Sequence, residues 1–427
     1  MSGLSRALAE AAAPPYNRPM TDPMMNHRLD QLGDYAFRRL ERLIDGVAPA
    51  TNEAPLKMSL GEPQHAPPAL LAETLAANAH LWNRYPPVAG TPDWRQAVAD
   101  WLTRRYRLPA GLIDADKHLL PAAGTREALF MVSLLCVEGA RSAPTPAVLM
   151  PNPYYQVYSG GGVMAGGEPV YLNATRETGF LPDLDALTPA LLERTAVLFM
   201  CSPANPQGAV ASLDYWKRAL GMARQYGFTL LADECYSEIY SDTPPPGALE
   251  AAAATGSLDN LLVFNSLSKR SSSPGLRCGL IAGDARLIAM FTRLRSYGGA
   301  GVPLPTIAAA AALYRDETHV EANRALYRAK FDAAARIFGT RHGFYRPGGG
   351  FFLWLDVGDG EAAARTIWRE AGVTTLPGGY LARPDTNGFN PGAAFVRIAL
   401  VHDVATVTDG LTRVARALDG HVRSAAE

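Results

Sequence analysis

Two side chains whose chemistry is complementary follow apolar runs in this 427-residue sequence. Lys269 ends the segment Asn-Ser-Leu-Ser-Lys directly after the apolar run 261–264, and its amine can form an imine. Asp233 ends the run Phe-Thr-Leu-Leu-Ala-Asp, so a carboxylate that needs a partner stands where a hydrophobic strand would end. Each residue also has an ordinary explanation, because a lysine after a strand is usually solvated and an aspartate there can cap a helix. The neighbouring motifs must decide between these alternatives.

Polar residues near this pair suit a phosphate group. Ser266, Ser268 and Arg277 offer hydroxyl donors and a guanidinium fork, which match a phosphate dianion. Gly124 and Thr125 follow an apolar run and open a helix, where free backbone amides and the helix dipole favour an anion. Many turns of this kind bind nothing, so the Gly-Thr pair is weak when taken alone. The whole set predicts a phosphorylated cofactor.

Other residues suit an aromatic ring on that cofactor. A carboxylate at Asp233 would keep a pyridinium nitrogen protonated, which lets the ring withdraw electrons from a carbanion. Tyr236 and the amide of Asn205 can donate to a phenolate oxygen of the ring, and Tyr155 can stack on it. The alternatives are a plain turn around Asn205 and simple packing for Tyr155.

Arg397 is the candidate for binding a substrate. It stands in the apolar run Phe-Val-Arg-Ile-Ala-Leu near the end of the chain. Its guanidinium can hold an α-carboxylate through two hydrogen bonds. The alternative is an arginine on the exposed face of a strand.

The elements that must position these residues follow an α/β pattern. From residue 119 to 268 short apolar runs alternate with helix-like segments, which is typical of βαβ units around a buried parallel sheet. The clearest predicted strands are 147–150, 196–200, 228–232 and 261–264. Ligands bind beyond the carboxyl ends of such strands. We therefore expect one pocket to be formed by the segments 152–155, 202–208, 233–236 and 265–269.

The length of the chain predicts two joined domains. Pro14 and Pro15 interrupt any helix near the start, so residues 1–24 are expected to form a flexible extension. Strand-like runs at 351–356 and 395–400 follow a helical, charged stretch, which indicates a smaller α+β domain. The expected division is an N-terminal arm with part of the small domain over 25–65, a large cofactor-binding domain over 66–305 and the small domain over 306–427.

Composition excludes several classes of function. Forty basic residues nearly cancel forty-one acidic ones, and without a basic stripe no nucleic-acid partner is expected. No window approaches the roughly 18 apolar residues of a membrane helix, so no membrane partner is expected either. The histidines are scattered and the cysteines form no C-x-x-C pair, so no metal site is expected. The wide spacing of the cysteines also gives no indication of a disulfide framework. A reduced, cytoplasmic location fits these cysteines, which are Cys136, Cys201, Cys235 and Cys278.

Taken together, the motifs resemble the fold-type I aminotransferases of class I/II. The resemblance covers about residues 25–419 and rests on Asn205-Pro-Gln-Gly208, Asp233-Glu-Cys-Tyr236, Ser266-Leu-Ser-Lys269, Arg277 and Arg397. It implies pyridoxal 5'-phosphate as the cofactor, with amino acids and 2-oxo acids as substrates. By this likeness Lys269 would hold the cofactor through an imine and then move a proton between substrate and cofactor. Asp233 would pair with the ring nitrogen, while Asn205 and Tyr236 would bind the ring oxygen.

The same resemblance implies the remaining roles. Tyr155 would stack on the ring, and the substrate would meet Arg397, Asn205 and the backbone around Gly61. Tyr85 looks like the family tyrosine that reaches the phosphate of a neighbouring subunit, which implies a homodimer. The residues expected to hold the phosphate within one chain are Gly124, Thr125, Ser266, Ser268 and Arg277.

Further segments are similar to the succinyldiaminopimelate transaminases of proteobacteria. These are Leu60-Gly-Glu-Pro-Gln-His65, Gly124-Thr-Arg-Glu-Ala-Leu-Phe130 and Leu376-Pro-Gly-Gly-Tyr-Leu-Ala-Arg383. The similarity implies amino transfer between N-succinyl-LL-2,6-diaminopimelate and 2-oxoglutarate in lysine and diaminopimelate biosynthesis. Gln207 and Ser272 depart from the commoner Thr and Asn, so the substrate-facing loops leave alternatives open. Those alternatives include an acetylornithine-like, aromatic or kynurenine-type transaminase and a β-lyase. A further alternative is a non-enzymatic regulatory module, which the N-terminal region argues against because it shows no helix-turn-helix pattern.

Overall fold

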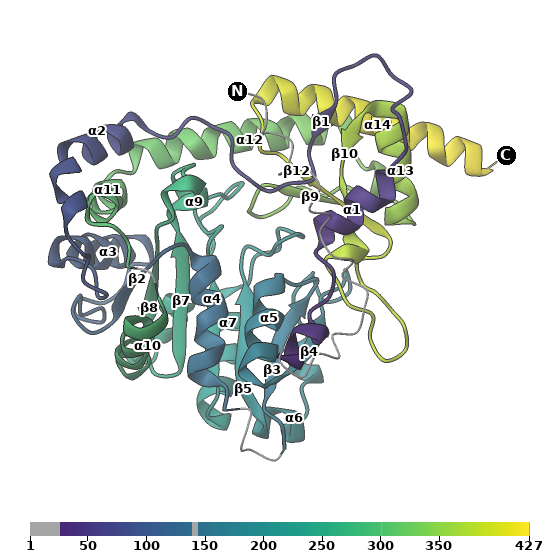
Figure 1. The fold of residues 1–427 in the computed structure, drawn as a ribbon. Helices are drawn as coiled ribbons and strands as arrows, with labels where there is room; N and C mark the ends of the chain where they lie inside the picture. The colour runs from purple at the N-terminus through teal and green to yellow at the C-terminus, as the bar shows by residue number, and fades with distance from the viewer. Residues whose placement is uncertain (1–25, 139–143, 300, 427) are drawn as a thin grey trace, which may run out of the picture.

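The computed structural model describes residues 26–138, 144–299 and 301–426, so the predicted extension over 1–24 lies outside the described residues. A sheet with helices on both faces forms the larger part of the molecule, and a smaller unit containing α13 and α14 lies beside it (Figure 1). The predicted α/β class is confirmed. No helix within the described ranges is both long and apolar enough to cross a bilayer.

The large sheet has seven strands in the order β2-β8-β7-β6-β5-β3-β4. β8 runs antiparallel to β7 and to β2, whereas the other neighbouring strands are parallel, so the predicted mainly parallel sheet is confirmed. The four predicted strands are all present. The strands are β2 Leu119–Ala122, β3 Ala147–Asn152, β4 Glu168–Asn173, β5 Thr195–Cys201, β6 Thr229–Asp233, β7 Leu261–Ser266 and β8 Gly279–Gly283.

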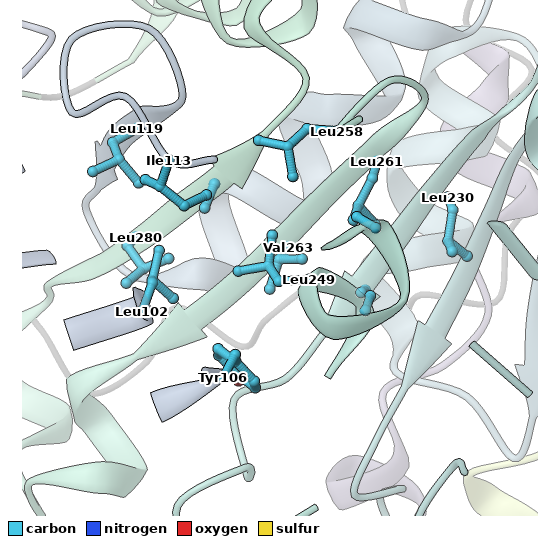
Figure 2. Close-up of a cluster of buried hydrophobic side chains, with 14 of the residues drawn as sticks. Leu102, Tyr106, Ile113, Leu119, Leu230, Leu249, Leu258, Leu261, Val263 and Leu280 are labelled. Atoms are coloured by element: carbon cyan, nitrogen blue, oxygen red, sulfur yellow. The ribbon is translucent and has the colours of Figure 1, made fainter. Parts of the chain in front are cut away.

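Side chains of the central strands alternate between two hydrophobic layers, as the period of a strand requires. On β5, Leu198 and Met200 join a cluster with α3, α7, α8 and α11, whereas Val197 and Phe199 face α4, α5 and α10. Figure 2 shows part of the first cluster, including Val263 of β7. The helices of this domain are α2 Ala69–Ala77, α3 Pro92–Arg105, α4 Thr125–Cys136, α5 Gln156–Ala165, α6 Pro189–Glu193, α7 Leu213–Tyr226, α8 Ala248–Ala253, α9 Leu267–Arg270, α10 Ala285–Gly298 and α11 Leu304–Arg315.

The small domain combines helices with two short sheets. β11, β12 and β9 form an antiparallel sheet, and β1 pairs with β10 in parallel, which brings the N-terminal arm into this domain. Its core contains residues of α12, α13 and α14. The elements are α1 Ala36–Ile44, β1 Leu56–Lys57, α12 Thr318–Phe338, β9 Phe352–Asp356, α13 Gly360–Ala371, β10 Val373–Thr374, β11 Leu376–Pro377, β12 Phe395–Ala399 and α14 Val404–Ala426.

The boundary between the domains is better placed after α11 than at residue 305. Ile307, Leu313 and Tyr314 of α11 are buried in the cluster that lies on the large sheet, where the helix contacts α2 and α3. The next helix, α12, extends from the neighbourhood of α11 across to the small domain (Figure 1). The exact division of the chain stays a proposal.

Candidate active site

A cavity of about 450 Å³ opens beyond the carboxyl ends of β3, β5, β6 and β7. Each of the four segments expected to converge contributes a residue to its wall, so that convergence is confirmed. The predicted site residues that line the cavity are Gly61, Thr125, Tyr155, Asn205, Asp233, Tyr236, Lys269 and Arg397.

Lys269 lies in the short helix α9, directly after β7, with its side chain in this cavity. Its Nζ donates to the carbonyl oxygen of Gly61 at 2.9 Å and stands 5.2 Å from the ring centre of Phe351. Burial lowers the pKa of the Lys269 amine to about 8, because a charged ammonium is poorly solvated there. A substantial fraction of the amine is therefore neutral near physiological pH and able to attack a carbonyl carbon.

Asp233 is the last residue of β6 and is buried. One carboxylate oxygen accepts a hydrogen bond from the Tyr158 hydroxyl at 2.6 Å, and the other accepts one from the Cys235 backbone amide at 3.2 Å. Burial raises the pKa of Asp233, and within the described part of the chain no Lys, Arg or His side chain lies within ion-pair distance of it. A cationic partner would stabilise this carboxylate. The predicted alternative of a helix cap is wrong, since the next α-helix begins at Ala248.

Arg397 on β12 is buried, so the alternative of an exposed strand arginine is wrong. Its guanidinium donates to Asn205 Oδ1 at 3.1 Å and to the Ser59 carbonyl at 2.8 Å, and it lies over the Phe352 ring. Burial lowers the pKa of Arg397 to about 10. Among the described residues no carboxylate forms an ion pair with it, and its Nε has no hydrogen-bond partner. An unpaired buried cation is costly, so this position favours an anionic ligand.

The remaining predicted residues do not line the cavity. Ser266 and Ser268 hydrogen-bond to each other through their hydroxyls at 3.0 Å. Arg277 is exposed and donates to the Pro274 carbonyl, and a Cβ on Gly124 would collide with its guanidinium. Gly124 has φ +85°, which a glycine adopts without strain. Because these residues surround the amino end of α4, their role in binding phosphate stays a proposal.

Tyr85 is fully exposed, with a relative solvent exposure of 100% for the residue in the single chain. It therefore contributes nothing to the cavity of its own chain. This exposure is compatible with the predicted contact to a neighbouring subunit, which stays a prediction.

The structure adds Tyr158, which the sequence analysis missed. It lies three residues after Tyr155, so both side chains project from the first turn of α5, with ring centres 5.6 Å apart. The ring of Tyr158 also stacks on Phe199 at 4.5 Å, which fixes the hydroxyl against Asp233. The i, i+3 spacing of the two tyrosines was the signal in the sequence.

Two arginines on the cavity wall were also missed as site residues. Nε of Arg126 donates to the Tyr155 hydroxyl at 2.7 Å, and Nε of Arg383 donates to the Tyr154 hydroxyl at 3.0 Å. Consecutive tyrosines after β3 thus each hold one guanidinium. Arg126 and Arg383 both stand in segments quoted for their likeness to succinyldiaminopimelate transaminases, but their sequence positions gave no sign that they face one cavity.

The profile of the family described as aminotransferase class I and II matches residues 53–414. The chain belongs to this family. A solved aminotransferase from Neisseria meningitidis superposes with a TM-score of 0.87 at 41% identity and covers 92% of this chain and 99% of its own. An LL-diaminopimelate aminotransferase of Desulforudis audaxviator is 32% identical over 398 residues, which are 91% of this chain and 96% of that protein. The 4-dedimethylamino-4-oxo-anhydrotetracycline transaminase OxyQ of Streptomyces rimosus is 32% identical over 346 residues, which are 81% of this chain and 88% of that protein.

Aminotransferases of this class depend on pyridoxal 5'-phosphate, and the cavity of this aminotransferase fits that cofactor. The buried amine of Lys269 can bond to the aldehyde carbon. Asp233 has no cationic partner among the described residues. The protonated ring nitrogen of the cofactor would be such a partner. Arg397 remains for the carboxylate of an amino acid substrate. The predicted cofactor is therefore confirmed by the family and matched by the charges that the cavity leaves unpaired.

Proposed function

We propose that this aminotransferase transfers an amino group between N-succinyl-LL-2,6-diaminopimelate and 2-oxoglutarate in lysine and diaminopimelate biosynthesis. The observation that carries the amino-transfer chemistry is a buried amine and a buried, carboxylate-free guanidinium in one cavity. The diaminopimelate skeleton is supported by the relative from D. audaxviator, and the succinyl group by the three similar sequence segments. Unacylated LL-diaminopimelate is the second candidate, because that relative is named for it.

Different residues of the cavity bind the substrate, move the proton and hold the cofactor ring. Arg397 holds the α-carboxylate of the substrate, which aims its Cα hydrogen at the amine of Lys269. With a pKa near 8, Nζ of Lys269 can take that proton and return it to another atom. Asp233, held by Tyr158, keeps positive charge on the ring nitrogen, while Asn205 and Tyr236 orient the ring oxygen. The bound cofactor supplies the electron sink that makes Cα acidic.

A substrate screen with purified, cofactor-loaded protein tests the proposal. Steady-state rates would be measured with 2-oxoglutarate and a panel of amino donors: N-succinyl-LL-diaminopimelate, LL-diaminopimelate, N-acetylornithine, phenylalanine and kynurenine. We expect the highest kcat/KM with the succinylated donor. A higher value with LL-diaminopimelate would establish the second candidate, and negligible rates with both beside a good rate with another donor would overturn the proposal. No change in cofactor absorbance with glutamate would revive a non-enzymatic role.

We also propose that the enzyme is a cytoplasmic homodimer. Tyr85 and Tyr297 are large aromatic residues that are 100% and 87% exposed in the single chain, as expected of side chains that a second subunit covers. Sedimentation of the cofactor-loaded protein should give twice the mass of the chain. A monomer with full activity would contradict this proposal and the assignment of Tyr85.

A further inference from the structure

Arg383 stands where two hollows of the molecule meet. It lines the large cavity that contains Lys269, and it also lines an adjoining pocket of about 240 Å³ with Tyr154 and Tyr380. The second pocket is formed by the N-terminal arm, by the segment that follows β11 and by Tyr154 after β3. Because Arg383 borders both hollows, a substrate bound in the large cavity can extend its side chain toward this arginine.

The backbone of Arg383 is fixed to the end of the large sheet. Its amide donates to the side chain of Asn152 at 2.9 Å, and its carbonyl accepts a hydrogen bond from the same side chain at 2.8 Å. Asn152 is the fully buried last residue of β3. The Tyr154 amide adds a hydrogen bond to the Leu381 carbonyl at 2.9 Å. This double attachment holds Arg383 in place before any ligand arrives, which lowers the cost of binding one.

The guanidinium of Arg383 is held but its charge is not neutralised. Its Nε donates to the neutral hydroxyl of Tyr154, Tyr171 is a second neutral neighbour, and no carboxylate among the described residues forms an ion pair with it. Since a guanidinium has five N–H donors, these tyrosines leave donors for a ligand. A Cβ on Gly33 would collide with this guanidinium, so the N-terminal arm approaches the arginine side chain closely.

The other charged groups of the second pocket already have partners. Asp34 pairs with Arg42, and this hydrogen bond lowers the pKa of Asp34. Arg39 lies 3.7 Å from Glu361 and over the ring of Tyr380. Arg383 is thus the cation of this pocket whose counter-ion the described residues do not supply.

We propose that Arg383 is a specificity-determining residue that binds the carboxylate at the far end of the amino donor's side chain. The planar fork of arginine matches a carboxylate through paired hydrogen bonds. The inference rests on the proposed function, because both candidate donors carry such a carboxylate. N-succinyl-LL-diaminopimelate has two of them at its far end, whereas LL-diaminopimelate has one beside an ammonium group.

A matched pair of donors isolates this contact. L-2-aminopimelate and L-2-aminoheptanoate have the same carbon skeleton and differ only in a terminal carboxylate against a methyl group. For the unaltered enzyme we expect kcat/KM to favour the dicarboxylate by about 100-fold. In Arg383→Gln this preference should fall to below about 5-fold, mainly through KM, while the rate with 2-aminoheptanoate stays within about 2-fold. Arg383→Lys should restore part of the preference because it keeps the charge without the fork.

Control variants separate this role from a structural one. Tyr154→Phe removes the hydroxyl that orients the guanidinium and should lower the preference by about 3- to 10-fold. Arg369→Gln removes the same charge from an exposed side chain on α13 and should change nothing. Cofactor absorbance and thermal melting would show that each variant is folded and loaded.

The outcomes distinguish the inference from the function on which it rests. An unchanged dicarboxylate preference in a folded, loaded Arg383→Gln enzyme would overturn the inference, whatever the natural donor is. If this variant loses activity with N-succinyl-LL-diaminopimelate and with LL-diaminopimelate equally, the contact is to the carboxylate that they share. A larger loss with the succinylated donor, beside the lost preference in the matched pair, would show that Arg383 contacts the acyl carboxylate as well. Failure of the unaltered enzyme with both donors, beside an Arg383-dependent preference in the matched pair, would refute only the proposed function.

Discussion

The inner end of the cavity, around Lys269, and the outer end, around Arg383, are built in different ways. At the inner end, Asp233 and Arg397 stand on strands, and they and Lys269 are largely buried. Backbone groups hold all three, and the side chains of Tyr158 and Asn205 add hydrogen bonds to Asp233 and Arg397. At the outer end, Arg126 and Arg383 are more exposed and are each held by a tyrosine hydroxyl. Buried strand ends fix atoms precisely, whereas a loop can change without disturbing the sheet. The comparison indicates that the inner end performs the reaction common to the family and the outer end selects the substrate.

The largest effect should follow loss of the reactive amine. Lys269→Ala should abolish both the visible imine band and turnover, a fall of several orders of magnitude, because no other amine of the described residues lines the inner end. Absorbance spectra and steady-state rates measure this. The fold should remain intact by circular dichroism, since the side chain makes a single hydrogen bond with the described residues. An unchanged spectrum, or a missing borohydride adduct at residue 269 in the unaltered protein, would refute the assignment of the inner end.

Loss of the Asp233 carboxylate should be nearly as damaging. Asp233→Ala should retain the cofactor but slow the half-reaction with glutamate by about 10³-fold, since the ring loses the anion that stabilises its charge as the carbanion forms. Rapid-mixing absorbance would measure the rate. Asp233→Asn, which keeps the shape, is the matched control and should be similarly slow. A near-normal rate in both variants would show that the reaction does not need the negative charge of Asp233. The inner end could then no longer be distinguished from the outer end as the part that performs the reaction.

An intermediate effect is expected at Tyr158, whose hydroxyl donates a hydrogen bond to Asp233. Tyr158→Phe removes one hydrogen bond to a carboxylate and should slow the half-reaction by about 10-fold. That hydrogen bond lowers the pKa of Asp233, so its loss should raise this pKa and move the acidic limb of the rate profile to higher pH. Selection between the matched donors should be unchanged. A changed selectivity with an unchanged pH profile would mean that Tyr158 belongs functionally to the outer end.

The inner end of the cavity could be predicted from the sequence, whereas the outer end could not. The strand ends were predictable because an apolar run predicts a strand, and the polar residues after it show where the strand ends. Asp233 and the segment Asn-Ser-Leu-Ser-Lys269 are both of this kind. Arg383 was not predictable, because the two residues whose side chains hold it, Tyr154 and Asn152, lie 229 and 231 residues away along the chain. The extent of the large domain was hard to predict for a related reason: the alanines of α11 give no direction, and the packing of this helix on α2 and α3 is what places it beside the large sheet.

The smallest expected effect is the pH dependence of cofactor binding, which depends on the amine of Lys269 alone. With a pKa near 8, about a tenth of Lys269 is neutral at pH 7 and about nine tenths at pH 9. The rate at which cofactor-free protein binds pyridoxal 5'-phosphate should therefore rise about 10-fold over this interval and level off above it. Stopped-flow absorbance measures the rate. An ordinary lysine would instead rise about 100-fold without a plateau, and that outcome would place the amine in a more solvated setting than the inner end provides.

The hydrogen bond from Lys269 to Gly61 ties the large sheet to the segment that follows β1 of the small domain. An imine nitrogen keeps at most one N–H, whereas the free amine offers two or three. Occupation of the lysine therefore weakens a bond across the joint between the two halves of the molecule. The empty protein is therefore expected to be held more firmly at this contact than the loaded one, so that uptake of the vitamin loosens the attachment between the two domains.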